Sequence, residues 1–303
     1  MPNPTTFAIF KELKEQKSIS DIAGMLGLNH STISTAVSSL IEEGLAQKQR
    51  DGKKVFAARA ITLHARSLAE FLNEYPRLQS EDIFSSSSLE VLSAITQLHN
   101  ITDIAAMTGL NRHTVSTALL KLSRYGIVLK EKRRFVLNKR HRQIAGFVSN
   151  YWRYIANQRL QDIAVDAVIL WQRGHEFLFK TQTAPEYNSE SNIQPTATTV
   201  FFEYNLRTIT TTRYYFYTRR KLSVEDHVIH MILIDPQNPI YNSYAAAFIM
   251  HSGTKDLLTT GRLYDMEDHV KSLLEYIDTK EKNSTFVLPW DEYMDLFDSL
   301  VVN

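Results

Sequence analysis

The chain of 303 residues contains no cysteine. This absence excludes a disulfide framework, a thiol nucleophile and any zinc site with cysteine ligands. An apolar run of membrane-spanning length is absent as well, and so is a charged segment followed by an apolar leader. We therefore expect a cytoplasmic protein that has no membrane partner.

Sequence motifs for catalysis and cofactor binding are missing too. No GxxxxGK[ST], GxGxxG, GxSxG or HExxH pattern occurs, and no Gly-Ser is followed by an Asp-x-Asp pair. His227 and His230, one helical turn apart, could ligate a metal together with His251 and His269, but such histidines more often cap or pack. The sequence therefore predicts no enzyme, no cofactor and no metal site.

Charge is unevenly distributed along the chain. The formal net charge is only +1, yet residues 1–150 hold 20 Lys and Arg against 13 Asp and Glu, whereas residues 151–303 hold 14 against 20. Lys and Arg gain affinity for phosphates by releasing condensed counterions. The basic first half therefore predicts a polyanionic partner for that half.

An internal repeat lies within this basic half. The stretch ISDIAGMLGLNHSTISTAVSSLIEEGLA, residues 19–46, recurs as ITDIAAMTGLNRHTVSTALLKLSRYGIV, residues 101–128, and about half of the paired positions are identical. In each copy we expect a capped short helix, a glycine turn, and a second helix that starts at an asparagine and ends at a glycine. These positions are Ser20, Gly27, Asn29 and Gly44 in the first copy and Thr102, Gly109, Asn111 and Gly126 in the second.

A predicted β-hairpin with a basic tip follows each copy. The segment AQKQRDGKKVFAAR places the turn signal Asp51-Gly52 between two strand-like runs, and VLKEKRRFVLNKRHR has seven Lys or Arg against one acid. An amphipathic helix precedes each copy, in TTFAIFKELKEQ and SSLEVLSAITQLHN. Each module is therefore predicted to consist of helix, helix, turn, helix and hairpin.

This order resembles the winged helix-turn-helix domains of MarR-like and ArsR-like regulators, over roughly residues 7–60 and 88–140. The resemblance implies that the second helix of each copy enters the major groove of DNA, while the hairpin, or wing, lies along phosphates or the minor groove. A winged helix that binds a protein instead of DNA is the alternative.

The candidate DNA-binding residues follow from this resemblance. Arg112 offers the bidentate contact to guanine that is the commonest specific readout, so we expect base readout to depend on the second copy. The other helix candidates are His30, Ser31, Ser34, Thr35 and Ser38 in the first copy and His113, Ser116, Thr117 and Lys121 in the second. The wing candidates, expected to hold phosphates without reading bases, are Arg50, Lys53, Lys54, Lys132, Arg133 and Arg134.

Two more amphipathic helices are predicted beside the modules, in ITLHARSLAEFLNEYPRL and QIAGFVSNYWRYIANQRLQDI. They either pair with each other or across a dimer, or they pack only on their own domains. The segment QSEDIFSSSS between the modules is expected to be a short linker or capping run.

From residue 163 the pattern changes to that of an α+β domain. DAVILWQRGHEFLFKTQT predicts a hairpin, LRTITTTRYYFYTRR predicts a long strand or a strand pair, and the polar TAPEYNSESNIQPTATT between them predicts a loop. Helices are predicted in SVEDHVIHMILID, NSYAAAFIMHS and MEDHVKSLLEYID. The order is more distantly similar to AbiEi-type antitoxins, in which a winged helix precedes an α/β domain.

The predicted fold class is α+β, with two winged helix-turn-helix domains, residues 1–76 and 84–160, followed by an α+β domain, residues 163–303, for sensing or partner binding. The predicted function is sequence-specific binding of double-stranded DNA in transcription regulation. The alternative is an antitoxin-like protein whose C-terminal domain binds a protein partner and whose winged helices regulate their own operon. A homodimer is left open.

Overall fold

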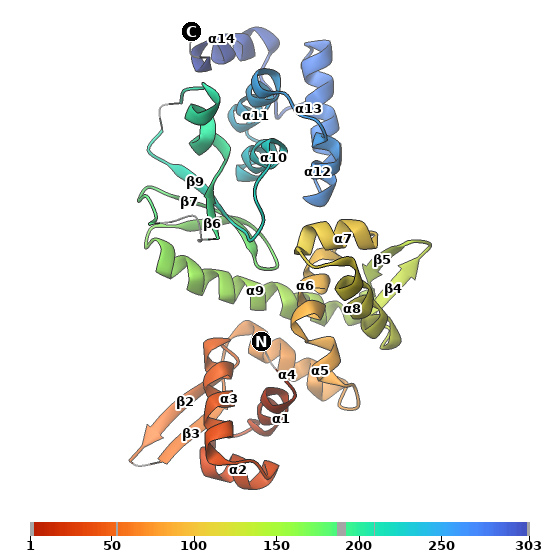
Figure 1. Ribbon diagram of the computed structural model, residues 1–303, viewed down its shortest axis with the longest axis vertical. Coiled ribbons are helices and arrows are strands. Elements are labelled where there is room, and N and C mark those ends of the chain that lie inside the picture. The colour runs from red at the N-terminus through yellow and green to blue at the C-terminus, as the bar shows by residue number, and fades with distance from the viewer. Residues whose placement is uncertain (1–2, 53, 187–191, 209, 302–303) are drawn as a thin grey trace. The chain divides into compact units, whose positions relative to one another are not determined.

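The computed structural model of the chain describes residues 3–52, 54–186, 192–208 and 210–301, and its fold is mixed α+β with small sheets (Figure 1). The chain divides into two compact units, Met1–Ala156 and Asn157–Asn303. The predicted domains 1–76 and 84–160 fall almost entirely within the first unit, and the predicted domain 163–303 falls within the second. The division into three domains stays a prediction.

The first repeat forms three helices and a three-stranded antiparallel sheet. Apolar residues of its helices, among them Phe7, Ile33 and Leu40, are fully buried because they recur on one side of each helix. The hairpin projects beyond the helices (Figure 1). In chain order the elements are α1 (Pro4–Glu12), β1 (Lys17–Ser18), α2 (Ile19–Leu26), α3 (His30–Glu42), β2 (Ala46–Asp51) and β3 (Lys54–Arg59).

The second repeat has the same order of elements with a shorter hairpin. His99 and Phe135 form an isolated bridge where β1 pairs with β3 in the first repeat. Its strands have four residues each, against six in the first hairpin. In chain order the elements are α6 (Ser86–Ala94), α7 (Ile101–Thr108), α8 (Arg112–Arg124), β4 (Val128–Glu131) and β5 (Arg134–Leu137).

Asparagine caps and glycine stops define α3 and α8, as the sequence predicted. Asn29 and Asn111 each accept, through the side-chain oxygen, a backbone N–H three residues further on at 2.8 Å. The glycines that follow the helices, Gly44 and Gly126, have φ angles of +65° and +67°. This left-handed conformation strains any residue with a Cβ, and it lets the chain leave the helix toward the hairpin.

The predicted caps of the shorter helices are wrong by two residues. The caps of α2 and α7 are Ser18 and Asn100 rather than Ser20 and Thr102. Each cap accepts the backbone N–H of an aspartate three positions further on, at 3.1 Å in the first repeat and 3.0 Å in the second. The cap side chain also donates to that aspartate's carboxylate, at 2.7 and 2.8 Å. The reciprocal bonding to the aspartate therefore decides where the helix starts.

Aromatic packing around Phe84 connects the two repeats within the first unit. Phe84 follows α5 (Ser80–Ile83) in the segment expected to be a linker, and its ring is fully buried. The ring lies 5.8 Å from Phe7 of α1, 5.3 Å from Phe71 of α4 (Leu63–Glu74) and 5.0 Å from Phe147 of α9 (Arg142–Ile163). The segment is therefore a packing element, and the expected capping run is confirmed at Ser85, the N-cap of α6, which accepts the Ser88 N–H at 3.4 Å.

Helices α4 and α9 also contact each other. The ring of His64 in α4 lies 5.9 Å from Tyr151 and 4.9 Å from Tyr154 of α9. His64 Nε2 is 2.8 Å from the carbonyl of Glu43, the residue that caps the end of α3. Of the two alternatives for these helices, the structure shows pairing with each other within one chain.

The second unit is a four-stranded antiparallel sheet with helices packed on it. The strand order is β6-β7-β9-β8, and residues such as Leu178 and Phe216 lie in the core between sheet and helices. The strands are β6 (Val168–Arg173), β7 (Glu176–Thr181), β8 (Ile193–Pro195) and β9 (Arg213–Tyr217). The helices are the 3₁₀ helix η2 (Ala197–Tyr204), α10 (Val224–Ile234), α11 (Pro239–Ser252), α12 (Leu257–Leu263), α13 (Glu267–Thr279) and α14 (Trp290–Leu300).

The sequence predicted part of this unit. The hairpin of β6 and β7 and the helices α10, α11 and α13 are confirmed. The loop expected between the strands is wrong in its second half, which forms β8 and η2, and the expected long strand is reduced to the five residues of β9. Before β9, Leu206 instead forms an isolated bridge with Val301 near the end of the chain, a pairing that local sequence does not reveal.

Among the described residues, no helix is both long enough and apolar enough to cross a membrane.

We expect alanine at Gly44 to destabilise the first unit far more than alanine at the equivalent Gly126. Both positions carry the left-handed strain, about 1–2 kcal/mol. A Cβ at Gly44 would also lie 2.6 and 2.8 Å from carbons of the Tyr154 ring, whereas one at Gly126 would meet nothing within 4 Å. Overpacking of this kind costs about a further 1–3 kcal/mol. Urea unfolding of Gly44→Ala and Gly126→Ala measures the difference, and equal midpoints would contradict it.

Candidate functional site

The exposed side of α8 carries four of the five helix residues predicted to contact DNA in the second copy. Val115, Ala118, Leu119 and Leu122 are buried, which turns the opposite side of the helix to solvent. We define the α8 face as the exposed residues of this side. They are Arg112, His113, Ser116, Thr117, Leu120 and Arg124.

The first repeat has a matching α3 face. Its exposed residues are His30, Ser31, Ser34, Thr35, Ser38 and Glu42. Every predicted helix candidate of the first copy therefore lies on one exposed surface. Ser31 is partly engaged, since its hydroxyl donates to Asn29 Oδ1 at 2.8 Å.

Lys121, the remaining helix candidate, forms an ion pair within the chain. Its Nζ lies 2.8 Å from Asp82 Oδ1, and the bond from Lys121 lowers the pKa of Asp82. The hydroxyl of Tyr125 donates to Gln79 at 2.9 Å beside this pair. Lys121 therefore fastens α8 to the α5 segment. At the constant offset of the repeat, Lys121 corresponds to Ser39 of the first copy. The predicted candidate Ser38 corresponds to Leu120, which was not predicted as a candidate.

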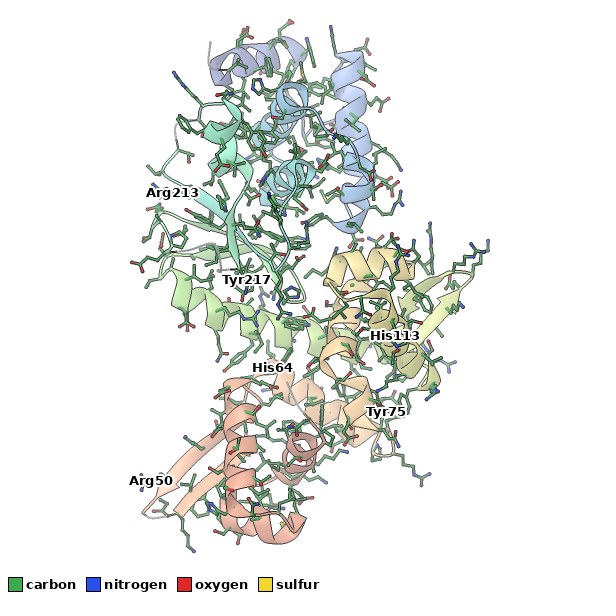
Figure 2. The ribbon with its side chains drawn as sticks, viewed as in Figure 1. Arg50, His64, Tyr75, His113, Arg213 and Tyr217 are labelled. Carbon is green, nitrogen blue, oxygen red and sulfur yellow. The ribbon has the colours of Figure 1, made fainter. Side chains whose placement is uncertain are left out.

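The hairpin tips hold the predicted phosphate-binding cations. Figure 2 shows Arg50 near the tip of the first hairpin, where its Nε donates to the Gly52 carbonyl at 3.3 Å. Lys54 is exposed, and Lys53 lies outside the described residues. In the second hairpin the cations of the tip are all exposed; they are Lys132, Arg133 and Arg134.

A groove separates α3 from the first hairpin. It has a volume of about 390 Å³, and its lining includes the apolar side chains of Val37 and Val55. Four predicted candidates line it together with Lys48; they are His30, Ser34, Ser38 and Arg50. Lys48 was not among the predicted phosphate contacts, but it lies on the same side of β2 as Arg50 because side chains alternate along a strand.

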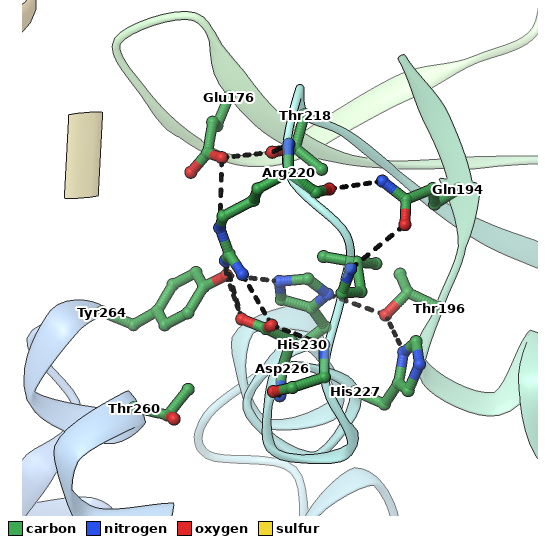
Figure 3. A network of polar contacts seen from close by, with 12 residues as sticks. Glu176, Gln194, Thr196, Thr218, Arg220, Asp226, His227, His230, Thr260 and Tyr264 are labelled. Carbon is green, nitrogen blue, oxygen red and sulfur yellow. Dashed lines mark hydrogen bonds and ion pairs between the residues drawn. The ribbon is translucent and has the colours of Figure 1, made fainter. Parts of the chain in front are cut away.

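The second unit contains a buried polar network around Asp226 (Figure 3). Arg220 donates from both terminal nitrogens to the two oxygens of Asp226, at 2.7 Å each. Arg220 Nε also lies 3.5 Å from Glu176 Oε1, and Glu176 accepts a hydrogen bond from Thr218. Asp226 is 2% and Glu176 8% exposed at the side chain, so both charges depend on Arg220.

Two histidines extend this network in one direction. Tyr264 donates its only hydroxyl proton to Asp226 at 2.9 Å and accepts from Arg220 at 2.6 Å. His230 Nε2, 2.9 Å from the same hydroxyl, must therefore carry a proton. Neutral His230 then accepts at Nδ1 from Thr196, at 2.7 Å. The Thr196 proton is used, so His227 Nδ1 must donate to Thr196 across 2.9 Å.

Burial and charge shift the pKa values in this network in opposite directions. Burial lowers the pKa of His227 to about 4 and that of His230 to about 3. Burial alone would raise the pKa of Asp226, but the hydrogen bonds and charge of Arg220 hold it well below its usual value. Glu176, less closely bound to Arg220, has a pKa raised by burial. Both histidines are thus neutral at pH 7.

The histidines considered as metal ligands are used in other ways. His227 and His230 share the hydroxyl of Thr196, and His269 Nε2 lies 2.7 Å from Asn242 Oδ1. Among the described residues, no group of three or more His, Asp or Glu side chains could hold a metal ion. The arrangement connects the sheet, α10 and the end of α12 through hydrogen bonds.

Comparison with known proteins bears on the second unit alone. A family model described as HVO_2833_C, C-terminal, matches residues 190–302. The match runs from β8 to α14 and includes Arg220, Asp226 and Tyr264 of the network, but not Glu176. No curated protein matches the chain.

We expect the second unit to lose stability between pH 7 and pH 5. An unfolded histidine has a pKa near 6.5, so acid protonates the unfolded chain first, and each buried histidine costs up to about 2 kcal/mol at pH 5. The raised pKa of Glu176 has the opposite effect and stabilises the folded unit as the pH falls, but it is one glutamate against two histidines. Asp226, whose pKa is lowered, adds to the loss only below about pH 4.

A single variant isolates the histidine effect. His227→Gln keeps a donor for Thr196 and removes one titrating group, so its free energy of unfolding should depend less on pH than that of the parent. His251→Gln, at an exposed histidine, is the control. The parent and both variants are equilibrated in urea at pH 7 and at pH 5. Unfolding of the second unit is then read from hydrogen exchange of α10 peptides, with the same labelling pH for every sample. Identical pH dependence in His227→Gln and the parent would refute the assignment.

Proposed function

We propose that the chain is a sequence-specific DNA-binding transcriptional regulator whose two repeats are winged helix-turn-helix modules. The observation that carries this proposal comes from the second repeat. There α8, with its exposed face, contacts a hairpin that has three exposed cations at its tip. An exposed polar helix next to a basic hairpin is the combination that major-groove readers use. The excess of Lys and Arg in residues 1–150 supports the same partner.

The two repeats would divide this work as two half-site readers in one chain. In such modules the second helix enters the major groove, and the hairpin contacts phosphates or the minor groove. Under this proposal Arg112, exposed at the first position of α8, contacts a guanine edge. The groove lined by Lys48 and Arg50 offers the first repeat a place for backbone phosphates.

Catalysis has no part in the proposal. The one dense cluster of ionisable groups described above, around Asp226, has its donors and acceptors matched to one another rather than presented to a substrate. We assign the second unit to sensing or partner binding.

We expect the cations of the second hairpin to supply nonspecific affinity. Replacing Lys132, Arg133 and Arg134 by alanine should weaken binding to all duplexes and reduce the slope of log affinity against log salt by about one per lost phosphate contact. The matched control replaces three exposed lysines of the second unit, Lys221, Lys255 and Lys282. A titration in which the hairpin variant keeps the slope of the parent would sink the idea.

We expect Arg112 and His30 to contribute unequally to base readout. Arg112→Ala should cost about 1–3 kcal/mol on the specific duplex and relax preference at one base pair, because a bidentate contact to guanine is lost. His30→Ala should cost less than about 1 kcal/mol, since one neutral contact is worth little net. Binding of both variants to a specific and a scrambled duplex decides. An equal loss for Arg112→Ala on the two duplexes would assign it to a phosphate instead.

A second candidate function is antitoxin-like binding of a protein partner by the second unit. Phe202 on η2 is 84% exposed, which is unusual for a large aromatic side chain, and residues 151–303 hold 20 Asp and Glu against 14 Lys and Arg. Co-expression with the product of the adjacent gene tests this candidate. If the chain relieves a growth defect caused by that gene product, and still does so without the hairpin cations, protein binding is favoured over DNA binding alone.

A further inference from the structure

Leu120 is the one apolar residue of the α8 face. It is 57% exposed, although the other residues of that face are polar or charged. At about 100° per residue, Leu120 falls between Ser116 and Thr117 around the helix and about 160° from the buried Leu122. It therefore lies near the middle of the exposed side, far from the core.

The internal repeat provides a natural comparison. The residues on either side of this position are the same in the two faces, since Ser34 and Thr35 of α3 correspond to Ser116 and Thr117 of α8. The residue that corresponds to Leu120 is Ser38, which is also exposed. The fold of the module therefore does not need a leucine at this position, and core packing does not account for the exposed side chain of Leu120.

Base-pair edges in the major groove offer one apolar group, the 5-methyl of thymine. The surroundings of Leu120 favour nucleic acid over an apolar protein surface, because Arg112 and Arg124 share its face and the cationic hairpin lies next to it. Arg112 and Leu120 are eight residues apart, about 12 Å along the helix, which spans three to four base pairs.

We propose that Leu120 packs against a thymine methyl and makes the second repeat select thymine at one position, about three to four base pairs from the guanine read by Arg112. This inference rests on the proposed function. The first repeat, with Ser38 in place of the leucine, lacks this selection. The two repeats then recognise different half-sites.

The experiment uses the full chain and a duplex that it selects from genomic fragments. Each thymine is replaced in turn by deoxyuridine, which keeps every hydrogen-bonding group and removes only the methyl. We expect one position in the second half-site where the replacement weakens binding about three- to fivefold, the value of one buried methyl. Leu120→Ser should abolish this sensitivity at that position alone, and Leu120→Met, which stays apolar, should retain it.

Ser38→Leu is the matched variant in the first repeat. It should leave the sensitivity of the second half-site unchanged. The proposal is overturned if no thymine is sensitive to replacement by deoxyuridine. It is also overturned if Leu120→Ser keeps the deoxyuridine penalty, that is, if this variant weakens binding equally to the thymine duplex and to its deoxyuridine counterpart. A change in sedimentation of Leu120→Ser without DNA would also overturn it, because Leu120 would then contact a second copy of the chain. Failure of the proposed function looks different, since the parent would then show no salt-dependent binding to any duplex.

Discussion

The packing of Phe84 is the interaction on which the first unit depends. The ring belongs to neither repeat, yet it contacts α1 of the first, the connecting helix α4, and α9, which follows the second. A buried aromatic ring contributes a large apolar area, so its removal would leave a cavity shared by all three helices. The same connection places Asp82 beside α8, where it binds Lys121. A segment of serines and acids thus holds the repeats in one unit.

Local signals in the sequence were sufficient for the repeats and insufficient for the second unit. The asparagine caps, the glycines with positive φ and the hairpin turns all depend on residues within four positions of each other, and these predictions are confirmed. The caps of α2 and α7 were predicted two residues too late, because Ser20 and Thr102, also common capping residue types, follow the observed caps Ser18 and Asn100. Leu120 was missed because the faces were matched by residue type rather than by the constant offset of the repeat.

The polar network shows what the spacing of the two histidines could not reveal about their partners. His227 and His230 lie one turn apart on α10, which suggests a metal, but their common partner Thr196 is more than 30 residues away in a segment predicted to be a loop. Asp226 and Tyr264 are 38 residues apart. Such contacts depend on how the sheet and helices pack, and nothing in the local sequence around either histidine marks the threonine.

Covalent duplication also changes what a pair of reading modules can do. In a symmetric homodimer both faces have the same sequence, so the two half-sites must be alike. Here the α3 and α8 faces share one serine–threonine pair but differ at Leu120, where α3 has Ser38, and at both ends, where Arg112 and Arg124 of α8 stand in place of His30 and Glu42. A charge reversal at one end cannot serve the same set of phosphates and bases in both copies. Under the proposed function, the chain would therefore recognise a site without two-fold symmetry and bind it in a single orientation.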